Sequence, residues 1–249
     1  MLPEIVVAAL LAATPAPTTA TVSTPAAAQT AAPAALPATP LREVVYKVST
    51  SERIDDITES YGGGANAVPP SSTLVDEAHG TITVDVMAKF EDGVLGIKVS
   101  ELWKNSPLPL HFTGAVTADG TVQFASATID SATIELLPYL ATSFAPQGAI
   151  VVGTHWSVDK VVGKATVSTD YIVTAAGSDG VTIHKDTKIS ALGTESVTGT
   201  IVYDPSLLVA TSGQIRVRRT DMFANGQTMH TIDIGFERIS DSFASAAKP

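Results

Sequence analysis

Apolar and polar residues alternate along most of the chain after residue 40, which is the pattern of half-buried β-strands. In the clearest stretch, Ile82, Val84 and Val86 fall on one face, with threonine and aspartate between them. Asp92-Gly93 then has the composition of a tight hairpin turn, and a return strand over residues 95–103 repeats the alternation. One face of this hairpin is therefore apolar and the other polar, as in an open antiparallel sheet.

Similar segments recur up to residue 239 and predict about eleven strands, five before a central helical stretch and six after it. Nearly every connection is short enough for a hairpin, which favours an antiparallel meander over parallel strands with long crossovers. A sheet of this size curls. The predicted fold is therefore mainly β, a large curved antiparallel meander that is half-barrel or barrel-like. One long piece, Asp55–Ala78, lacks the alternation, and we expect it to be a flexible flap or a disordered loop.

The residues from Asp130 to Phe144 have the pattern of a helix, in contrast to the strand-like segments on either side. Asp130 and Ser131 suit the N-cap, because their side-chain oxygens accept the free N–H groups of a first turn. Pro138 interrupts the pattern, since proline in a helix interior removes a hydrogen bond and clashes with the preceding turn. We therefore expect either a short turn followed by a helix that begins at Pro138, or a kinked helix.

This central helix is predicted to cover the apolar face of the sheet. Two interpretations fit: it fills a solid core, or it is a lid that closes a pocket for a lipophilic ligand. In the second case, the ligand-binding residues on the lid and on the apolar face are Ile134, Leu137, Leu140, Phe144, Trp103 and Trp156.

The first forty residues have a different composition from the rest. Residues 5–13 form an apolar run that is too short to span a bilayer and suits a secretory signal, although no basic residue precedes it. Small-residue cleavage sites follow Ala20 and Ala28. We assign residues 1–20 to a signal peptide and residues 21–40 to a linker rich in alanine, proline and threonine. Residues 41–241 form a single all-β domain, and residues 242–249 a frayed tail. The protein is accordingly expected to be exported, with a periplasmic, cell-surface or secreted location and no transmembrane span.

Charge and cysteine content exclude several classes of function. The chain has no cysteine, so disulfides, thiol catalysis and cysteine metal sites are ruled out. Its formal net charge of −10 argues against binding to nucleic acid.

No catalytic or metal-binding motif stands out. The five histidines do not occur at ligand spacing, and the acidic cluster Asp55, Asp56 and Glu59 lacks the spacing of a calcium loop. Neither a Gly-x-Ser-x-Gly elbow nor a Ser-x-x-Lys motif is present. We therefore predict a non-catalytic protein without a metal or cofactor.

The one basic cluster includes Arg216 and Arg218, which share the face opposite Ile215 and Val217. Such a pair is able to hold a carboxylate or phosphate head group. More often it meets acidic side chains across the sheet, and we favour that interpretation.

A weak internal similarity relates residues 80–93 to residues 213–226. In both, two aliphatic residues and a phenylalanine stand at the same distance from a glycine, and both end in Asp-Gly or Asn-Gly. Because any two hairpins share some of this pattern, both duplication and coincidence remain open.

Two functions are consistent with these features. The element order of residues 41–240 is similar in layout to the half-barrel carriers of lipids and lipoproteins in bacterial envelopes, which implies a lipophilic ligand. The alternative is a solid-core structural or interaction module whose partner is an envelope protein.

Overall fold

The structure, a computed structural model, describes residues 39–58, 71–124, 131–146, 148–162, 165–191, 193–223 and 226–243. The predicted signal peptide and nearly all of the predicted linker lie outside these residues, as does the segment from 59 to 70. The elements in chain order are β1 (Arg42–Thr58), β2 (Ser71–Lys89), β3 (Leu95–Trp103), β4 (Leu110–Val116), β5 (Val122–Phe124), α1 (Ser131–Leu136), the 3₁₀ helix η1 (Leu137–Leu140), β6 (His155–Val162), β7 (Ala165–Gly177), β8 (Gly180–Ala191), β9 (Gly193–Asp204), β10 (Val209–Phe223) and β11 (Gly226–Asp241).

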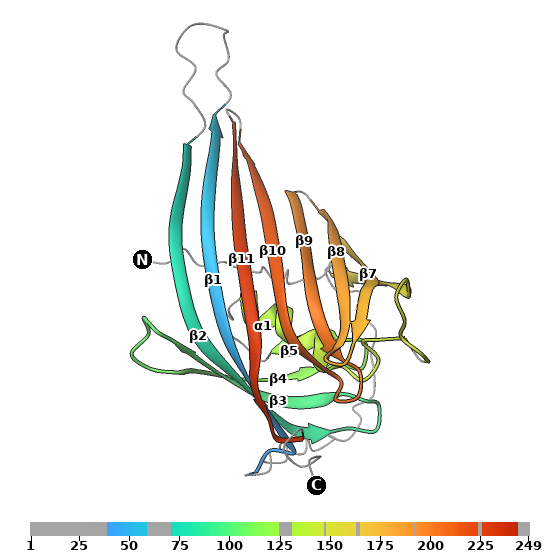
Figure 1. The fold of residues 1–249 in the computed structure, drawn as a ribbon. Coiled ribbons are helices and arrows are strands. Elements are labelled where there is room, and N and C mark those ends of the chain that lie inside the picture. The colour runs from blue at the N-terminus through green and yellow to red at the C-terminus, as the bar shows by residue number, and fades with distance from the viewer. Residues whose placement is uncertain are drawn as a thin grey trace, which may run out of the picture.

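All strands belong to one 11-stranded antiparallel sheet with the order β5-β4-β3-β2-β1-β11-β10-β9-β8-β7-β6. Two meanders thus join at its centre, where the first and last strands pair along their length. The sheet is curved and open, and α1 lies inside the curve (Figure 1). This confirms the predicted fold class, including the central helix against the apolar face.

We call the two faces of the sheet concave and convex. The concave face carries Val44, Tyr46 and Val48 of β1, all at most 1% exposed, whereas the convex face carries Val45, Lys47 and Ser49. The lower end of the sheet holds Arg42 and the upper end holds Thr58. Figure 1 shows β1, β2, β10 and β11 projecting at the upper end, beyond the other strands.

The core occupies the concave side of the lower half. Side chains from β1 to β4 and from β7 to β11 meet there with those of α1 and η1. Alternation along each strand puts the apolar residues on this face, and the curl brings the two arms of the sheet around the helices.

Glycines under aromatic rings accompany the curl at three places. A Cβ on Gly80 would lie 2.7 Å from the Trp103 ring, one on Gly114 2.6 Å from Phe124, and one on Gly213 2.5 Å from Phe236. In each case the glycine and the aromatic residue are cross-strand partners. A ring therefore lies flat over a position where any side chain would hold it away.

Two of these pairs fall in the stretches related by internal similarity. Gly80 pairs with Trp103 and Ile82 with Glu101, while Gly213 pairs with Phe236 and Ile215 with Ile234. The similarity thus extends to the register of both hairpins. Duplication itself stays a prediction.

The predicted helix is present but short, and it continues as a 3₁₀ turn. Pro138 lies in the first turn of η1, where its missing N–H removes no helical hydrogen bond. Pro138 thus lies at the start of a helical turn, as one of the two alternatives expected, but that turn is 3₁₀ and the α-helix precedes it. Asp130, one of the two predicted N-cap residues, lies outside the described residues.

The expected irregular loop over Asp55–Ala78 is wrong at both ends. β1 continues to Thr58 and β2 begins at Ser71, and the two strands pair with each other there. Leu74 and Val75 stand next to each other among mostly polar residues there, so the sequence has no apolar alternation to reveal the strands. Backbone pairing to β11 and β1 holds them extended instead.

Candidate functional site

The six residues predicted to line a lipophilic pocket fall into two groups. Leu137, Leu140 and Phe144 are at most 6% exposed and form part of the core. Ile134, Trp103 and Trp156 are partly exposed at its border. The space between η1 and the sheet is thus occupied by side chains in this region.

Phe144 lies at the centre of an aromatic cluster. Its ring centroid is 5.0 Å from that of Tyr139, 5.0 Å from Tyr203, 5.2 Å from Tyr171 and 5.8 Å from Trp156. Edge-to-face contacts of this kind add to the stability gained from burial. The cluster joins the end of η1 to β6, β7 and β9.

Three polar atoms of the cluster have no hydrogen-bond partner within the described residues: the hydroxyls of Tyr139 and Tyr203 and the indole N–H of Trp156. Burial raises the pKa of the Tyr139 hydroxyl well above its usual value and that of Tyr203 to about 12. Both phenols therefore stay protonated at neutral pH, as hydrogen-bond donors rather than charges.

Two carboxylates, one buried and one partly exposed, attach α1 to opposite arms of the sheet. Glu101 of β3, only 1% exposed, accepts hydrogen bonds from Thr133 of α1 and from Trp103 Nε1, the latter at 3.3 Å. Glu135 of α1 forms an ion pair with Lys185 of β8. Burial by itself would lower the pKa of Lys185, but the charge and hydrogen bond of Glu135 raise it. The helix is thus held by polar contacts on both sides.

Above the helix, toward the upper end, the concave face continues with a row of aliphatic and threonine side chains. Cross-strand pairing places in one row Ile232, Val217, Val197, Thr187, Thr169 and Val158, from β11 to β6. Ile232, Val217 and Val158 are only partly buried. The threonine hydroxyls of this row bond to each other, 3.0 Å apart. We call these six residues the aliphatic row.

The next row upward carries charge. Arg219 pairs across the sheet with His230 on one side and Glu195 on the other. His230 Nδ1 lies 3.2 Å from Glu52, and Arg219 donates to Asp221 at 3.0 Å. Burial raises the pKa of Glu195. We call these five residues the charged rim, and together with the aliphatic row it forms an amphiphilic surface on the concave face.

The predicted head-group residues lie on the opposite, convex face. Arg216 donates to both carboxylate oxygens of Asp233, at 2.6 and 3.1 Å, so its guanidinium group already has an acidic partner. That contact raises the pKa of Arg216. Arg218 is exposed and pairs in register with Thr231 of β11 and Ser196 of β9. Arg216 therefore has the cross-sheet acidic partner that the sequence analysis favoured.

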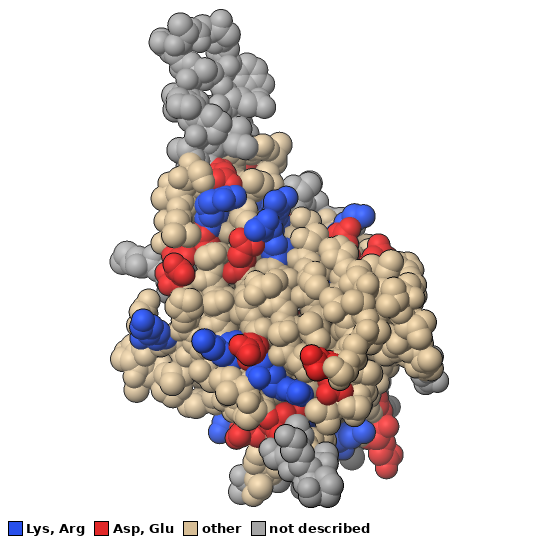
Figure 2. Space-filling model, in the orientation of Figure 1, with Lys and Arg blue, Asp and Glu red and all other residues tan. Residues whose placement is uncertain are grey.

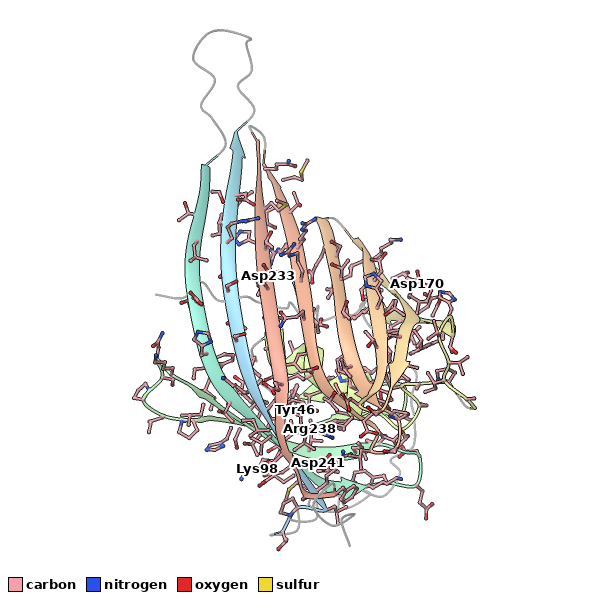
Figure 3. The ribbon with its side chains drawn as sticks, in the orientation of Figure 1. Tyr46, Lys98, Asp170, Asp233, Arg238 and Asp241 are labelled. Carbon is pink, nitrogen blue, oxygen red and sulfur yellow. The ribbon has the colours of Figure 1, made fainter. Side chains whose placement is uncertain are left out.

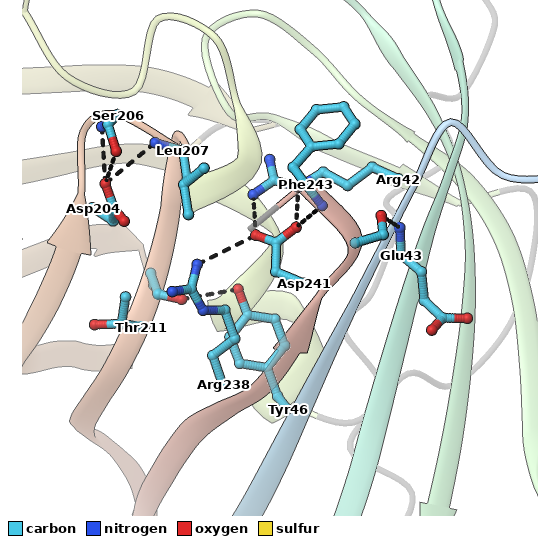
Figure 4. Close-up of polar contacts among 12 residues, drawn as sticks. Arg42, Glu43, Tyr46, Asp204, Ser206, Leu207, Thr211, Arg238, Asp241 and Phe243 are labelled. Atoms are coloured by element: carbon cyan, nitrogen blue, oxygen red, sulfur yellow. Dashed lines mark hydrogen bonds and ion pairs between the residues drawn. The ribbon is translucent and has the colours of Figure 1, made fainter. Parts of the chain in front are cut away.

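A polar cluster closes the lower end of the sheet (Figure 4). Arg42 of β1 donates to both oxygens of the Asp241 side chain in β11, at 3.1 and 2.6 Å, and Arg238 donates to Asp241 at 3.2 Å. The Tyr46 hydroxyl donates to the Ala210 carbonyl at 3.1 Å. Arg42 and Asp241 are 199 residues apart in the sequence, and their contact joins β1 to β11. The role of the cluster is therefore structural.

The part of the chain that the structure describes offers neither a metal-binding cluster nor a membrane-spanning helix. That part has no group of three or more histidine, aspartate or glutamate side chains arranged to hold a metal ion. It also has no helix of sufficient length and hydrophobicity to cross a bilayer. Of the acidic cluster singled out in the sequence, Asp55 lies 3.4 Å from Arg53, and Glu59 is outside the described residues.

Sequence reasoning missed the buried polar residues, above all Glu101 and Lys185. A signal for them existed, because both stand in phase with aliphatic residues of their strands: Val99 precedes Glu101 and Ile183 precedes Lys185. A charged residue at an inward position predicts a buried partner, but the partner's identity requires the fold.

Comparison with known proteins identifies no family and a weak structural similarity. The sequence matches no protein-family model and no curated protein. A solved structure described as "Lipid-protein interactions in lipovitellin" is similar at a TM-score of 0.46 and 10% identity, over 84% of this chain. The match spans only 26% of that much longer chain. A similarity at this level carries no functional argument.

Proposed function

We propose that this protein is a non-catalytic binding module that holds a lipophilic molecule on its concave face, above α1. The observation that carries the proposal is the partial exposure of Ile232, Val217 and Val158 in the aliphatic row. Burying such side chains under a ligand is favourable by roughly 25 cal/mol for each Å² of apolar surface. The lipophilic part of the ligand would lie along this row.

The charged rim supports an amphiphilic ligand rather than a purely apolar one. It offers donors and acceptors on four adjacent strands, β1, β11, β10 and β9, next to the aliphatic row. An apolar floor with a few polar groups at one side is the usual composition of sites for small lipophilic molecules. The ligand therefore lies above the helix, with Trp156 and Ile134 near its border, and not within the filled core around Leu137 and Phe144.

Native mass spectrometry of protein purified without detergent tests this proposal, together with titration of a fluorescent fatty acid. We expect a copurified lipid and saturable binding of the probe. Val217→Glu, which puts a charge in the aliphatic row, should weaken binding by about tenfold or more, since tenfold corresponds to roughly 1.4 kcal/mol. Ile172→Glu, on the convex face, is the matched control and should bind like the unaltered protein.

Thermal unfolding shows whether both variants fold. If Val217→Glu does not fold, Val217→Thr keeps the shape of the side chain, adds one hydroxyl to the row, and should still weaken binding. Absence of any lipophile together with absence of probe binding would overturn the proposal.

That result would support the alternative, a solid-core module that binds an envelope protein. One feature favours this second function. Residues 71–78 of β2 pair only with β1 among the described residues, and Leu74 there is 62% exposed. An unpaired strand edge with an exposed aliphatic side chain is able to add a strand from another protein.

We also propose that the protein is exported. The apolar run of residues 5–13, followed by a spacer of alanine, proline and threonine, supports this. Cell fractionation with N-terminal sequencing is the test. A mature chain that begins after Ala20 or Ala28 is expected, whereas a full-length chain in the cytoplasm would contradict it.

A further inference from the structure

Two hollows lie side by side on the convex face, away from the proposed lipophile site. One has a volume of about 600 Å³ and is lined by residues of β1, β11, β10 and β9. The other, of about 510 Å³, extends across β11, β10, β9 and β8. Thr200 and Gln214 line both, so the two form one elongated trough.

Strand register explains the trough. Cross-strand pairing places one row across its floor, with small or uncharged side chains: Ser49, Gly235, Gln214, Thr200 and His184. Longer charged residues stand on either side, Lys47 and Glu237 in the row below and Asp233 and Arg216 in the row above. Four strand spacings of about 4.8 Å give the floor a length of roughly 19 Å.

The figures show this arrangement on the face turned to the viewer. In Figure 2 a band without lysine, arginine, aspartate or glutamate crosses the middle of the molecule, with charged residues above and below it. Figure 3, in the same orientation, labels Asp233 at the upper side of the band.

The lining mixes polar groups with apolar surface, and its charged residues are balanced. Hydroxyls of Ser49, Ser212, Thr198 and Thr200 and the amide of Gln214 both donate and accept hydrogen bonds. Lys47 stands opposite Glu237 in the strand register, and Arg216 forms an ion pair with Asp233. Val48, Ile215 and Phe236 also line the trough, but they are at most 4% exposed and belong to the core. Val202 lines it too and is partly exposed.

This chemistry excludes several classes of ligand. A lipid chain needs a continuous apolar surface, and a peptide with apolar anchors needs pockets for them, whereas Val202 is a single partly exposed aliphatic side chain among hydroxyl and amide groups. Nucleic acid needs an excess of basic residues, which the balanced lining does not provide. An elongated neutral molecule with many hydroxyls matches the trough, because each of its groups also donates and accepts. We propose that the trough binds a neutral oligosaccharide, independently of the lipophile on the concave face.

Titration calorimetry and amide chemical-shift mapping with cellohexaose, maltohexaose and chitohexaose test this inference, with a sulfated heparin hexasaccharide as the charged comparison. At least one neutral probe should bind with a Kd of about 1 mM or tighter, which is ordinary for an open, hydrated site. Shifts should fall on Ser49, Gln214 and Thr200.

Thr200→Arg fills the middle of the trough and should weaken binding by at least about tenfold. Thr113→Arg is the matched control, because Thr113 is also an exposed threonine within a strand, on β4. Gln214→Ala removes hydrogen bonds without filling the trough and should weaken binding less than Thr200→Arg.

Failure of all three neutral probes to bind at about 10 mM would overturn the proposal. Equal affinity in Thr200→Arg and Thr113→Arg would do the same, as would tighter binding of the sulfated sugar. None of these results affects the lipophile proposal, whose variants lie on the other face.

Discussion

At the lower end of the sheet, Asp241 shows how a single residue connects distant parts of the chain. Its side chain is fully buried and shared by Arg42 and Arg238, which are 8% and 17% exposed. Burial by itself would raise the pKa of Asp241, but the hydrogen bonds and charge of Arg42, with the Phe243 amide and Arg238, lower it. Losing one partner of such a buried pair leaves an uncompensated charge.

Asp241→Asn should therefore destabilise the protein by about 3 kcal/mol at pH 7, as measured by urea unfolding. Because the folded pKa lies below the unfolded one, this contribution is present above about pH 4 and is lost as pH falls through the folded pKa. The unaltered protein should lose this stability as pH falls below about 4, and the variant should show a flatter profile there.

Asp233→Asn is the control for this prediction. Its pair with Arg216 has the same two-pronged geometry, but the side chains are 44% and 48% exposed. Solvent screening should limit its cost to about 1 kcal/mol or less. Equal costs for the two variants would show that burial of Asp241 contributes nothing.

Among the elements, the hairpins β2–β3 and β10–β11 each contain a glycine that lies under an aromatic ring, Gly80 under Trp103 and Gly213 under Phe236. At Gly213 a Cβ would also lie 3.1 Å from the carbonyl oxygen of Thr200, so backbone restricts it as well as the Phe236 ring. Since Phe236 also contacts Tyr46 and Tyr139, the ring has little freedom to move.

Gly213→Ala should accordingly destabilise the protein by about 2 kcal/mol through overpacking, as measured by thermal or urea unfolding. Gly177 is a matched control at the end of β7, because nothing lies within 4 Å of its Cβ position and its φ is not positive. Gly177→Ala should change stability by less than about 0.5 kcal/mol. If both variants are equally stable, the ring over Gly213 is free to shift.

Over the whole molecule, hydrogen bonding and packing are distributed differently. β1 is paired on both sides along nearly its whole length. Its lower part, Val44–Val48, carries core side chains, whereas every side chain from Thr50 to Asp55 is partly or fully exposed. The core therefore supports only the lower half of the longest strands.

Hydrogen exchange should reveal this difference within a single strand. Amides of Val44, Tyr46 and Val48 should exchange only on global unfolding, and those of Thr50–Asp55 through local opening at least about ten times more often. Equal protection along β1 would mean that hydrogen bonding alone sets local stability, or that a ligand or partner covers the upper half.

Local periodicity was enough to predict the strand-rich antiparallel class, the curl and the short interrupted helix. Each depends on neighbours in sequence, such as the alternation around Ile82 and the position of Pro138. Tertiary structure decided the rest, because pairing between distant strands leaves no local period. It joined β1 to β11 through Arg42 and Asp241 and extended residues 55–58 and 71–78, which lack alternation, as strands. It placed Lys185 against Glu135 and aligned Ser49, Gly235, Gln214 and Thr200 into the convex trough. Their neighbours across the sheet, and hence their chemistry, exist only once the register of the whole sheet is fixed.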